Sequence, residues 1–231
     1  MKNTLIRSVI FDFDGLIMDT EYPIFQSWQE LFHSQGGRLE TSDWVHYVGT
    51  MDNERDFVEE LEVQIGRKLD RKKLNDARWQ RETELIAAQP LLPGVLSYLD
   101  DARRLGLKIG LASSSPWEWV GGHLTQRGLI DYFDCIRTRE NVTRLKPEPE
   151  LYYSVLAALE LTPDQAIVLE DSSPGVTAAR RAGLFCVAVP NQLTRLLPLD
   201  HANLLLKSLE DLSLEALLEK AAEARNGHGH L

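Results

Sequence analysis

The first apolar, β-branched run of the chain ends in Phe11-Asp12-Phe13-Asp14-Gly15-Leu16-Ile17-Met18-Asp19. Residues 5–11 have the composition of a buried strand, and two carboxylates follow with one residue between them. Strand alternation would send Asp12 and Asp14 to opposite faces, but a turn at Gly15 lets both reach the edge of a sheet. Two acids in a water-poor cleft need a cation or a shared proton. Mg²⁺ fits, because it prefers oxygen ligands.

Four later segments repeat the apolar pattern, at 107–112, 133–138, 166–169 and 185–189. Segments with helical spacing lie between them, at 116–128, 149–159 and 175–182. Strands that alternate with helices predict a parallel sheet covered by helices on both faces. We therefore expect a Rossmann-like α/β fold, in which ligands bind beyond the carboxyl ends of the strands.

Residues 18–89 break this alternation. They carry helical patterns at 24–35, 53–65 and 71–88 and no convincing strand, and Pro90 and Pro93 mark the return to the alternating pattern. We predict an inserted α-helical cap domain at 18–89 over a core domain formed by 1–17 and 90–231. The hinges are expected near 16–20 and 89–93.

Composition narrows the class of protein. Acidic residues exceed basic ones by ten in a chain of 231 residues, which argues against nucleic acid and against anionic membranes as partners. No apolar run approaches the roughly 20 residues that span a bilayer, and no secretory pattern opens the chain. We expect a cytoplasmic protein whose two cysteines, Cys135 and Cys186, are buried free thiols.

Polar groups also follow the later strands. Ser113-Ser114-Ser115 precedes a helix and suits an anion, although these residues could equally cap the helix. Lys146 is held between prolines in Lys146-Pro147-Glu148-Pro149, where an exposed loop lysine is the ordinary alternative.

A second carboxylate pair, Glu170-Asp171, follows the strand at 166–169. Either acid could complete a metal site, or the pair could belong to a helix-capping sequence. Four strand ends that carry acid, hydroxyl, lysine and acid in this order favour a single site.

These motifs resemble those of the haloacid dehalogenase superfamily over nearly the whole chain. Asp12-Phe-Asp14-Gly-x-x-x-Asp19 resembles its nucleophile motif, Ser113 its phosphate-binding hydroxyl, Lys146 its phosphate-binding lysine, and Glu170-Asp171 its distal acidic motif. The helical insert resembles the cap of the β-phosphoglucomutase and phosphatase branch. Superfamily membership alone leaves the substrate open.

The resemblance implies a mechanism. Asp12 would attack phosphorus to form an aspartyl-phosphate, and Asp14 would protonate the leaving oxygen and then deprotonate water. Mg²⁺ would bind Asp12, the backbone carbonyl of Asp14, and Asp171. Phosphate oxygens would contact Ser113, Ser114 and Lys146, while Glu170 would orient Lys146 or a metal-bound water.

Three activities fit this resemblance to different degrees. Halide-displacing members lack the second acid, so Asp14 argues against a dehalogenase. Phosphomutases of this branch share Asp19-Thr20 and Trp28 but carry a histidine a few residues after Asp19, where this chain has Glu21-Tyr22-Pro23-Ile24-Phe25. We predict a phosphatase acting on a small phosphorylated metabolite such as a sugar phosphate. A phosphomutase and a non-catalytic phosphate sensor are the alternatives.

The cap residues that read the substrate are the least constrained by the sequence. The candidates are Asp19, Thr20, Glu21, Trp28, Thr50 and Arg55, and each has an ordinary structural role as its alternative. Trp117 and Trp119 are expected to cover the sheet together with Val120. No heptad or large apolar stripe indicates an oligomer, so a monomer or a weak oligomer fits equally.

Overall fold

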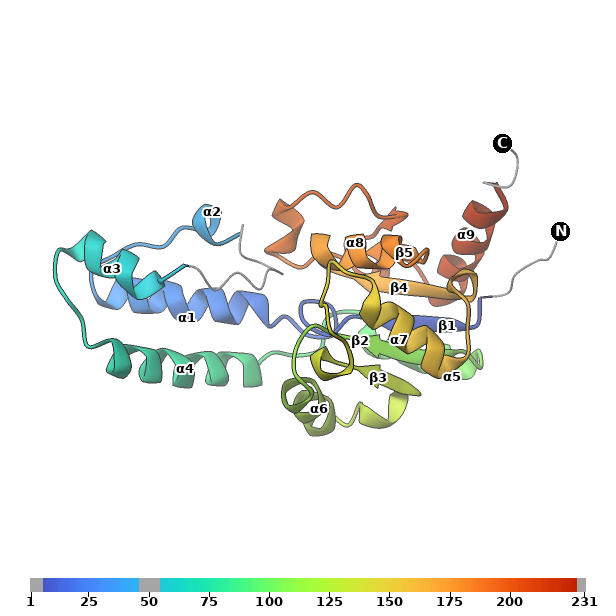
Figure 1. The fold of residues 1–231 in the computed structure, drawn as a ribbon, viewed down its shortest axis with the longest axis horizontal. Helices are drawn as coiled ribbons and strands as arrows, with labels where there is room; N and C mark the ends of the chain where they lie inside the picture. Colours follow the sequence, from blue (N-terminus) through green and yellow to red (C-terminus); the bar gives the residue numbers. More distant parts are fainter. Residues whose placement is uncertain (1–5, 46–54, 228–231) are drawn as a thin grey trace.

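A six-stranded parallel sheet forms the centre of the molecule (Figure 1). The computed structural model describes residues 6–45 and 55–227. The strand order is β3-β2-β1-β4-β5-β6, and every neighbouring pair is parallel. The strands are β1 (Ser8–Phe11), β2 (Lys108–Ala112), β3 (Cys135–Arg137), β4 (Ala166–Glu170), β5 (Phe185–Ala188) and β6 (Leu204–Leu205).

The predicted α/β fold is therefore confirmed. All five strands expected from the sequence are present, with ends displaced by at most a few residues. The strand β6 was missed, because it has two residues and lies at the edge of the sheet, where it pairs only with β5. Cys135 and Cys186 are buried free thiols, as expected.

Side chains alternate between the two faces of the sheet, and a layer of helices covers each face. Val9 and Phe11 of β1 pack in one core cluster with α5 (Val95–Arg104), α6 (Trp117–Gln126) and α9 (Leu214–Gly227). Ile10 packs in the other cluster with α7 (Glu150–Leu159) and α8 (Ser173–Arg181). Burial on both faces explains why these strands are apolar throughout.

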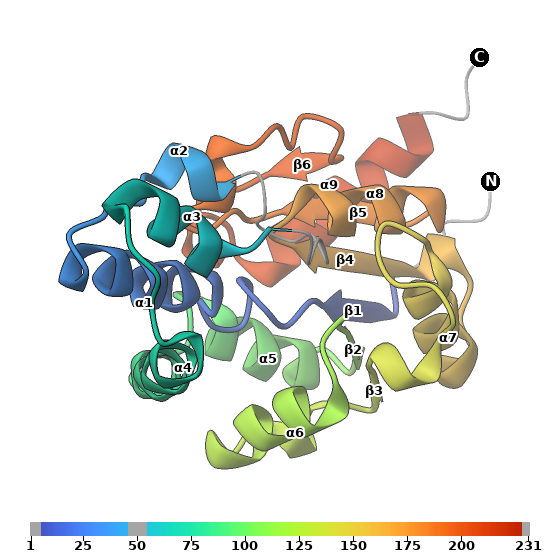
Figure 2. The same cartoon turned by 60° about the vertical axis from the view of Figure 1, so that its left-hand side comes forward.

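In its described residues, the insert contributes four helices beyond the ends of the strands. They are α1 (Glu21–Ser34), α2 (Thr41–Trp44), α3 (Phe57–Ile65) and α4 (Arg71–Ala87), and α1 and α4 lie side by side, pointing away from the sheet (Figures 1 and 2). Their apolar side chains form a separate cluster that includes Phe25, Phe32 and Trp44. An inserted helical cap is thus present, while its limits at residues 18 and 89 stay a prediction.

The two connections between core and insert touch each other. Met18 and Leu91 form an antiparallel bridge, and the amide of Leu92 donates a 2.9 Å hydrogen bond to the carbonyl of Ile17. Both connections fall within the ranges where hinges were expected. Within the described residues, no helix is both long enough and apolar enough to cross a bilayer.

Gly15 makes the tight turn that follows β1. Its φ is +75°, and its amide donates a 2.8 Å hydrogen bond to the carbonyl of Met18. A Cβ at this position would lie 2.1 Å from Oδ2 of Asp171. Glycine is required here because the backbone is left-handed and approaches a carboxylate closely.

Candidate active site

Asp12 lies at the carboxyl end of β1 and contacts Lys146. The Nζ of Lys146 donates hydrogen bonds of 2.7 Å to Oδ1 of Asp12, 2.6 Å to Oε1 of Glu170 and 2.9 Å to the carbonyl of Ala112. The lysine side chain is only 6% exposed. Burial alone disfavours the ammonium, but the negative charges of Asp12 and Glu170 raise the pKa of Lys146 above its usual value.

The carboxyl group of Asp12 is strongly perturbed. Burial raises its pKa to about 8, and the negative charge of Glu170 acts in the same direction, while Lys146 opposes the shift. Ionisation of Asp12 at this buried position therefore costs free energy, unless positive charge beyond that of Lys146 is supplied.

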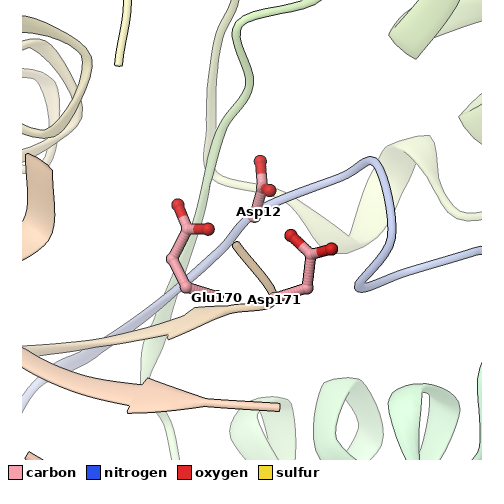
Figure 3. A group of neighbouring side chains, drawn as sticks. All are labelled: Asp12, Glu170 and Asp171. Carbon is pink, nitrogen blue, oxygen red and sulfur yellow. The ribbon is translucent and has the colours of Figure 1, made fainter. Parts of the chain in front are cut away.

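Three acids converge where β1 and β4 end (Figure 3). Asp12, Glu170 and Asp171 each offer an oxygen within 4.8 Å of the others, and all three side chains are buried. Burial, followed by the charge of Asp12, raises the pKa of Asp171 well above its usual value. Oε2 of Glu170 and Oδ1 of Asp171 are buried and lack a hydrogen-bond partner among the residues that the structure describes. This set of oxygens fits a hard divalent cation such as Mg²⁺.

Asp14 has a different set of partners and accepts hydrogen bonds at both of its carboxylate oxygens. Its Oδ1 accepts from the hydroxyl of Thr20 and from the indole N–H of Trp119, both at 2.9 Å. Its Oδ2 accepts from the hydroxyls of Ser115 at 2.6 Å and Ser113 at 3.3 Å. The side chains of Asp12 and Asp14 therefore have different surroundings although one residue separates them.

A cavity of about 190 Å³ lies over these groups. Its floor includes Asp12, Asp14 and Lys146, and its wall on the insert side includes Thr20, Glu21 and Ile24. Burial raises the pKa of Glu21 to about 8, with smaller contributions from the nearby acids, Asp14 first. The insert thus adds the carboxyl group of Glu21 to the cavity wall, and at pH 7 this group favours its neutral form.

The hydroxyl-bearing loop after β2 forms another part of the wall. Ser113, Ser114 and Ser115 all line the cavity. The Oγ of Ser114 is buried and has no hydrogen-bond partner within the described parts of the chain. The backbone amide of Ser115 donates to Oγ of Ser113 at 3.0 Å, which uses one acceptor position of this hydroxyl and leaves its hydrogen able to donate.

The remaining cap candidates lie elsewhere. Asp19 accepts a hydrogen bond from the amide of Tyr22 and lines a separate cavity of about 660 Å³. Trp28 packs against Phe57 in the insert. Arg55 bonds to Glu60, and Thr50 lies outside the described residues. A substrate-reading role for these four candidates stays a prediction.

Three contacts of the site were not predicted from the sequence. The side-chain Nδ2 of Asn191 donates a 2.9 Å hydrogen bond to Oδ2 of Asp171, and the hydroxyl of Tyr152 donates to Glu170. Trp119 was expected only to cover the sheet, yet its indole reaches Asp14. The same expectation was wrong for Trp117, which is 50% exposed and lies over Gly121. Helical periodicity identified a buried face but did not show which aromatic N–H would meet an acid.

The comparison with known proteins agrees with this geometry. Residues 9–189 match the family model of the haloacid dehalogenase-like hydrolases. The chain belongs to the haloacid dehalogenase-like hydrolase family. The predicted superfamily and the prediction of an enzyme of the hydrolase class are therefore confirmed.

Individual proteins resemble the chain along most of its length. YhcW of Bacillus subtilis is 43% identical over 215 residues, which cover 93% of this chain and 97% of YhcW. A phosphorylated carbohydrates phosphatase of Thermotoga maritima is 30% identical, over 78% of this chain and 82% of its own. The crystal structure of a β-phosphoglucomutase from Clostridium difficile matches with a TM-score of 0.73 at 28% identity, covering 96% of this chain and 100% of the other.

Proposed function

We propose that this protein is a Mg²⁺-dependent phosphatase that hydrolyses a small phosphorylated metabolite of the sugar phosphate class through an aspartyl-phosphate on Asp12. One observation carries the proposal: Asp12 and Asp14 line the same cavity, but only Asp12 joins the lysine and the acidic cluster. Asp14 instead contacts hydroxyls and an indole. Two carboxyl groups with different surroundings suit a nucleophile and a proton carrier.

In the first step, a carboxylate oxygen of Asp12 forms a bond to phosphorus while the bond to the leaving oxygen breaks. Asp14 gives its proton to that oxygen, so the product leaves as an alcohol. In the second step, water attacks phosphorus, Asp14 takes its proton, and the bond between Asp12 and phosphorus breaks. The carboxylate of Asp12 and inorganic phosphate result, so one difficult displacement becomes two easier ones.

The cavity wall supplies groups for the phosphoryl oxygens. Lys146 offers a buried positive charge beside Asp12. Ser113 and Ser114 offer hydroxyls, and the buried Oγ of Ser114, which has no partner among the described residues, supports a bound acceptor at that point. Donors fixed in advance around a developing charge typically contribute about 100- to 1000-fold each to the rate.

Asp12, Asp171 and the backbone carbonyl of Asp14 would hold Mg²⁺. When bound, the ion supplies positive charge that lets a carboxylate approach a phosphate dianion. Oδ1 of Asp171, which is buried without a hydrogen-bond partner in the described part of the chain, supports this assignment. Glu170 is assigned to Lys146 instead, because one of its oxygens accepts the hydrogen bonds of both Lys146 and Tyr152.

Hydrolysis is favoured over phosphoryl transfer between positions of a sugar. Among the described residues that line the cavity, the insert contributes Thr20, Glu21 and Ile24 and no histidine. The Thermotoga maritima relative is named as a phosphatase of phosphorylated carbohydrates, which supports the same substrate class. Glu21 adds a group that can hydrogen-bond a sugar hydroxyl.

The proposal is tested by incubating the protein with Mg²⁺ and a panel of sugar phosphates, measuring inorganic phosphate. Release from at least one ester, abolished by EDTA and by Asp12→Asn, is expected. A second arm supplies glucose 1-phosphate with a bisphosphate activator. Isomerisation there without phosphate release would overturn the phosphatase in favour of a mutase.

A further inference from the structure

Trp119 gives Asp14 a hydrogen bond that differs in kind from the others. The two oxygens of Asp14 accept from Thr20 and Trp119 on one side and from Ser113 and Ser115 on the other. A hydroxyl can donate or accept, whereas an indole N–H can only donate. Oδ1 is thus committed to accepting, because Trp119 Nε1 lies 2.9 Å from it.

This commitment decides which oxygen of Asp14 can exchange its hydrogen bonds during a reaction. The indole N–H keeps one acceptor position of Oδ1 occupied, whereas both side-chain partners of Oδ2 are hydroxyls that can donate or accept. Oδ2 also lies on the side of Ser113, which contributes to the phosphate-binding wall. Oδ2 is therefore the oxygen of Asp14 that is suited to a hydrogen bond with the reacting group.

The indole itself is held in place by the core. Trp119 packs against the apolar cluster under the sheet, and its ring meets His123 edge-on at a centroid distance of 4.5 Å. His123 in turn stacks on Phe13 at 6.1 Å. Thr20, the other donor to Oδ1, precedes α1 at the connection to the insert. Of these two donors, Trp119 is the one whose position is fixed by the catalytic core.

We infer that Trp119 is a positioning residue that holds the carboxyl group of Asp14 with Oδ2 turned toward the leaving oxygen. The inference rests on the proposed phosphatase activity, and it assigns the indole N–H a specific part in that activity. Loss of the N–H would leave Asp14 held only by hydroxyls, which can themselves rotate. The step that suffers is proton delivery to the leaving group, which alkyl phosphates require and p-nitrophenyl phosphate largely does without.

The test compares Trp119→Phe with the wild-type enzyme on a sugar phosphate and on p-nitrophenyl phosphate. Phenylalanine keeps the ring and removes the donor. A hydrogen bond to a charged group typically corresponds to about a 10- to 100-fold effect. We therefore expect kcat/KM for the sugar phosphate to fall by about this factor when the N–H is removed. For p-nitrophenyl phosphate it should change little. The ratio of the two values does not depend on the fraction of folded enzyme.

Trp117→Phe is the matched control, because Trp117 begins the same helix but is half exposed. It should leave both substrates unaffected. Equal losses of Trp119→Phe on both substrates, or no loss, would overturn the positioning role while leaving the phosphatase intact. A wild-type enzyme inactive on every ester would overturn the proposed function, and the inference with it.

Discussion

The Nζ of Lys146 and Oε1 of Glu170 are joined by a hydrogen bond of 2.6 Å, with side chains 6% and 0% exposed. Glu170 is fixed in turn by the hydroxyl of Tyr152 and by the first turn of α8, where a Cβ at Gly175 would meet its carboxylate. Lys146 therefore reaches Asp12 from a rigid support. An ammonium held in this way contributes to binding phosphate without reorganising during the reaction.

Lys146→Met should lower kcat/KM by about 100- to 1000-fold, as expected when a fixed donor to the transition state is removed. It should also destabilise the fold by about 3 kcal/mol, because Asp12 and Glu170 would remain buried without their partner. Steady-state kinetics and urea unfolding in EDTA measure the two effects. The exposed Lys72→Met, which breaks only a surface pair with Asp76, should change stability by less than about 0.5 kcal/mol.

If Lys146→Met were as stable as the wild-type protein and kept its activity, the buried contact between Lys146 and Asp12 would have no functional role. If stability alone fell, the lysine would be structural and the phosphate would be bound by other groups.

Asp171→Asn should weaken the response of the protein to Mg²⁺. A ligand that binds the folded state raises the melting temperature, so the wild-type protein should melt higher as Mg²⁺ is added. In the variant, this rise should largely disappear. Without Mg²⁺ the variant should be at least as stable as the wild type, since burial and the charge of Asp12 disfavour the Asp171 carboxylate.

Differential scanning fluorimetry across a Mg²⁺ titration gives this measurement. Asp76→Asn, at an exposed position on α4, should keep the wild-type response. An equal Mg²⁺ response in Asp171→Asn and the wild type would contradict the assignment of Asp171 as a ligand.

Glu21 should make stability depend on pH in a predictable direction. Burial raises its pKa to about 8 in the folded protein, against an ordinary value of 4.5. Between these values the folded state holds a proton that the unfolded state has released, so raising the pH favours unfolding. The contribution of Glu21 is fully present below about pH 4.5 and is lost as the pH rises through about 8.

Glu21→Gln removes this contribution and leaves the other acids in place. The free energy of unfolding of the variant should therefore gain on that of the wild type, by on the order of 1 to 3 kcal/mol, as the pH rises across this range. Urea unfolding in EDTA at several pH values provides the difference. A difference that stays constant with pH would contradict a neutral Glu21.

The main parts of the site were predictable because of the geometry of a parallel sheet. Asp12, Ser113 and Asp171 follow three different strands, and parallel strands end at one edge, so spacing along the chain placed them together. The support around them was not predictable in the same way. Asn191 reaches Asp171 from a loop after β5 that has no pattern of its own.

The roles of the cap residues were harder to predict than those of the core. Trp28 was a candidate for contacting the substrate. In the structure it packs against Phe57, and the guanidinium of Arg78 lies 4.6 Å from the centre of its ring. Helical spacing does not show which residues of α1 pack against the other helices of the insert and which reach the cavity. Glu21 is the first residue of α1, directly after Thr20, and both residues line the cavity.

Trapping the phosphoryl group tests the central claim most directly. Asp14→Asn should slow the second step, because the base that activates water is lost, while p-nitrophenyl phosphate still permits the first. Rapid acid quench followed by mass spectrometry of peptides should then find one phosphoryl group on the peptide that contains Asp12. Hydroxylamine should remove it, and the double variant Asp12→Asn/Asp14→Asn should lack it. Steady turnover by the wild type with no adduct on this peptide in either enzyme, or an adduct on another residue, would contradict nucleophilic catalysis by Asp12.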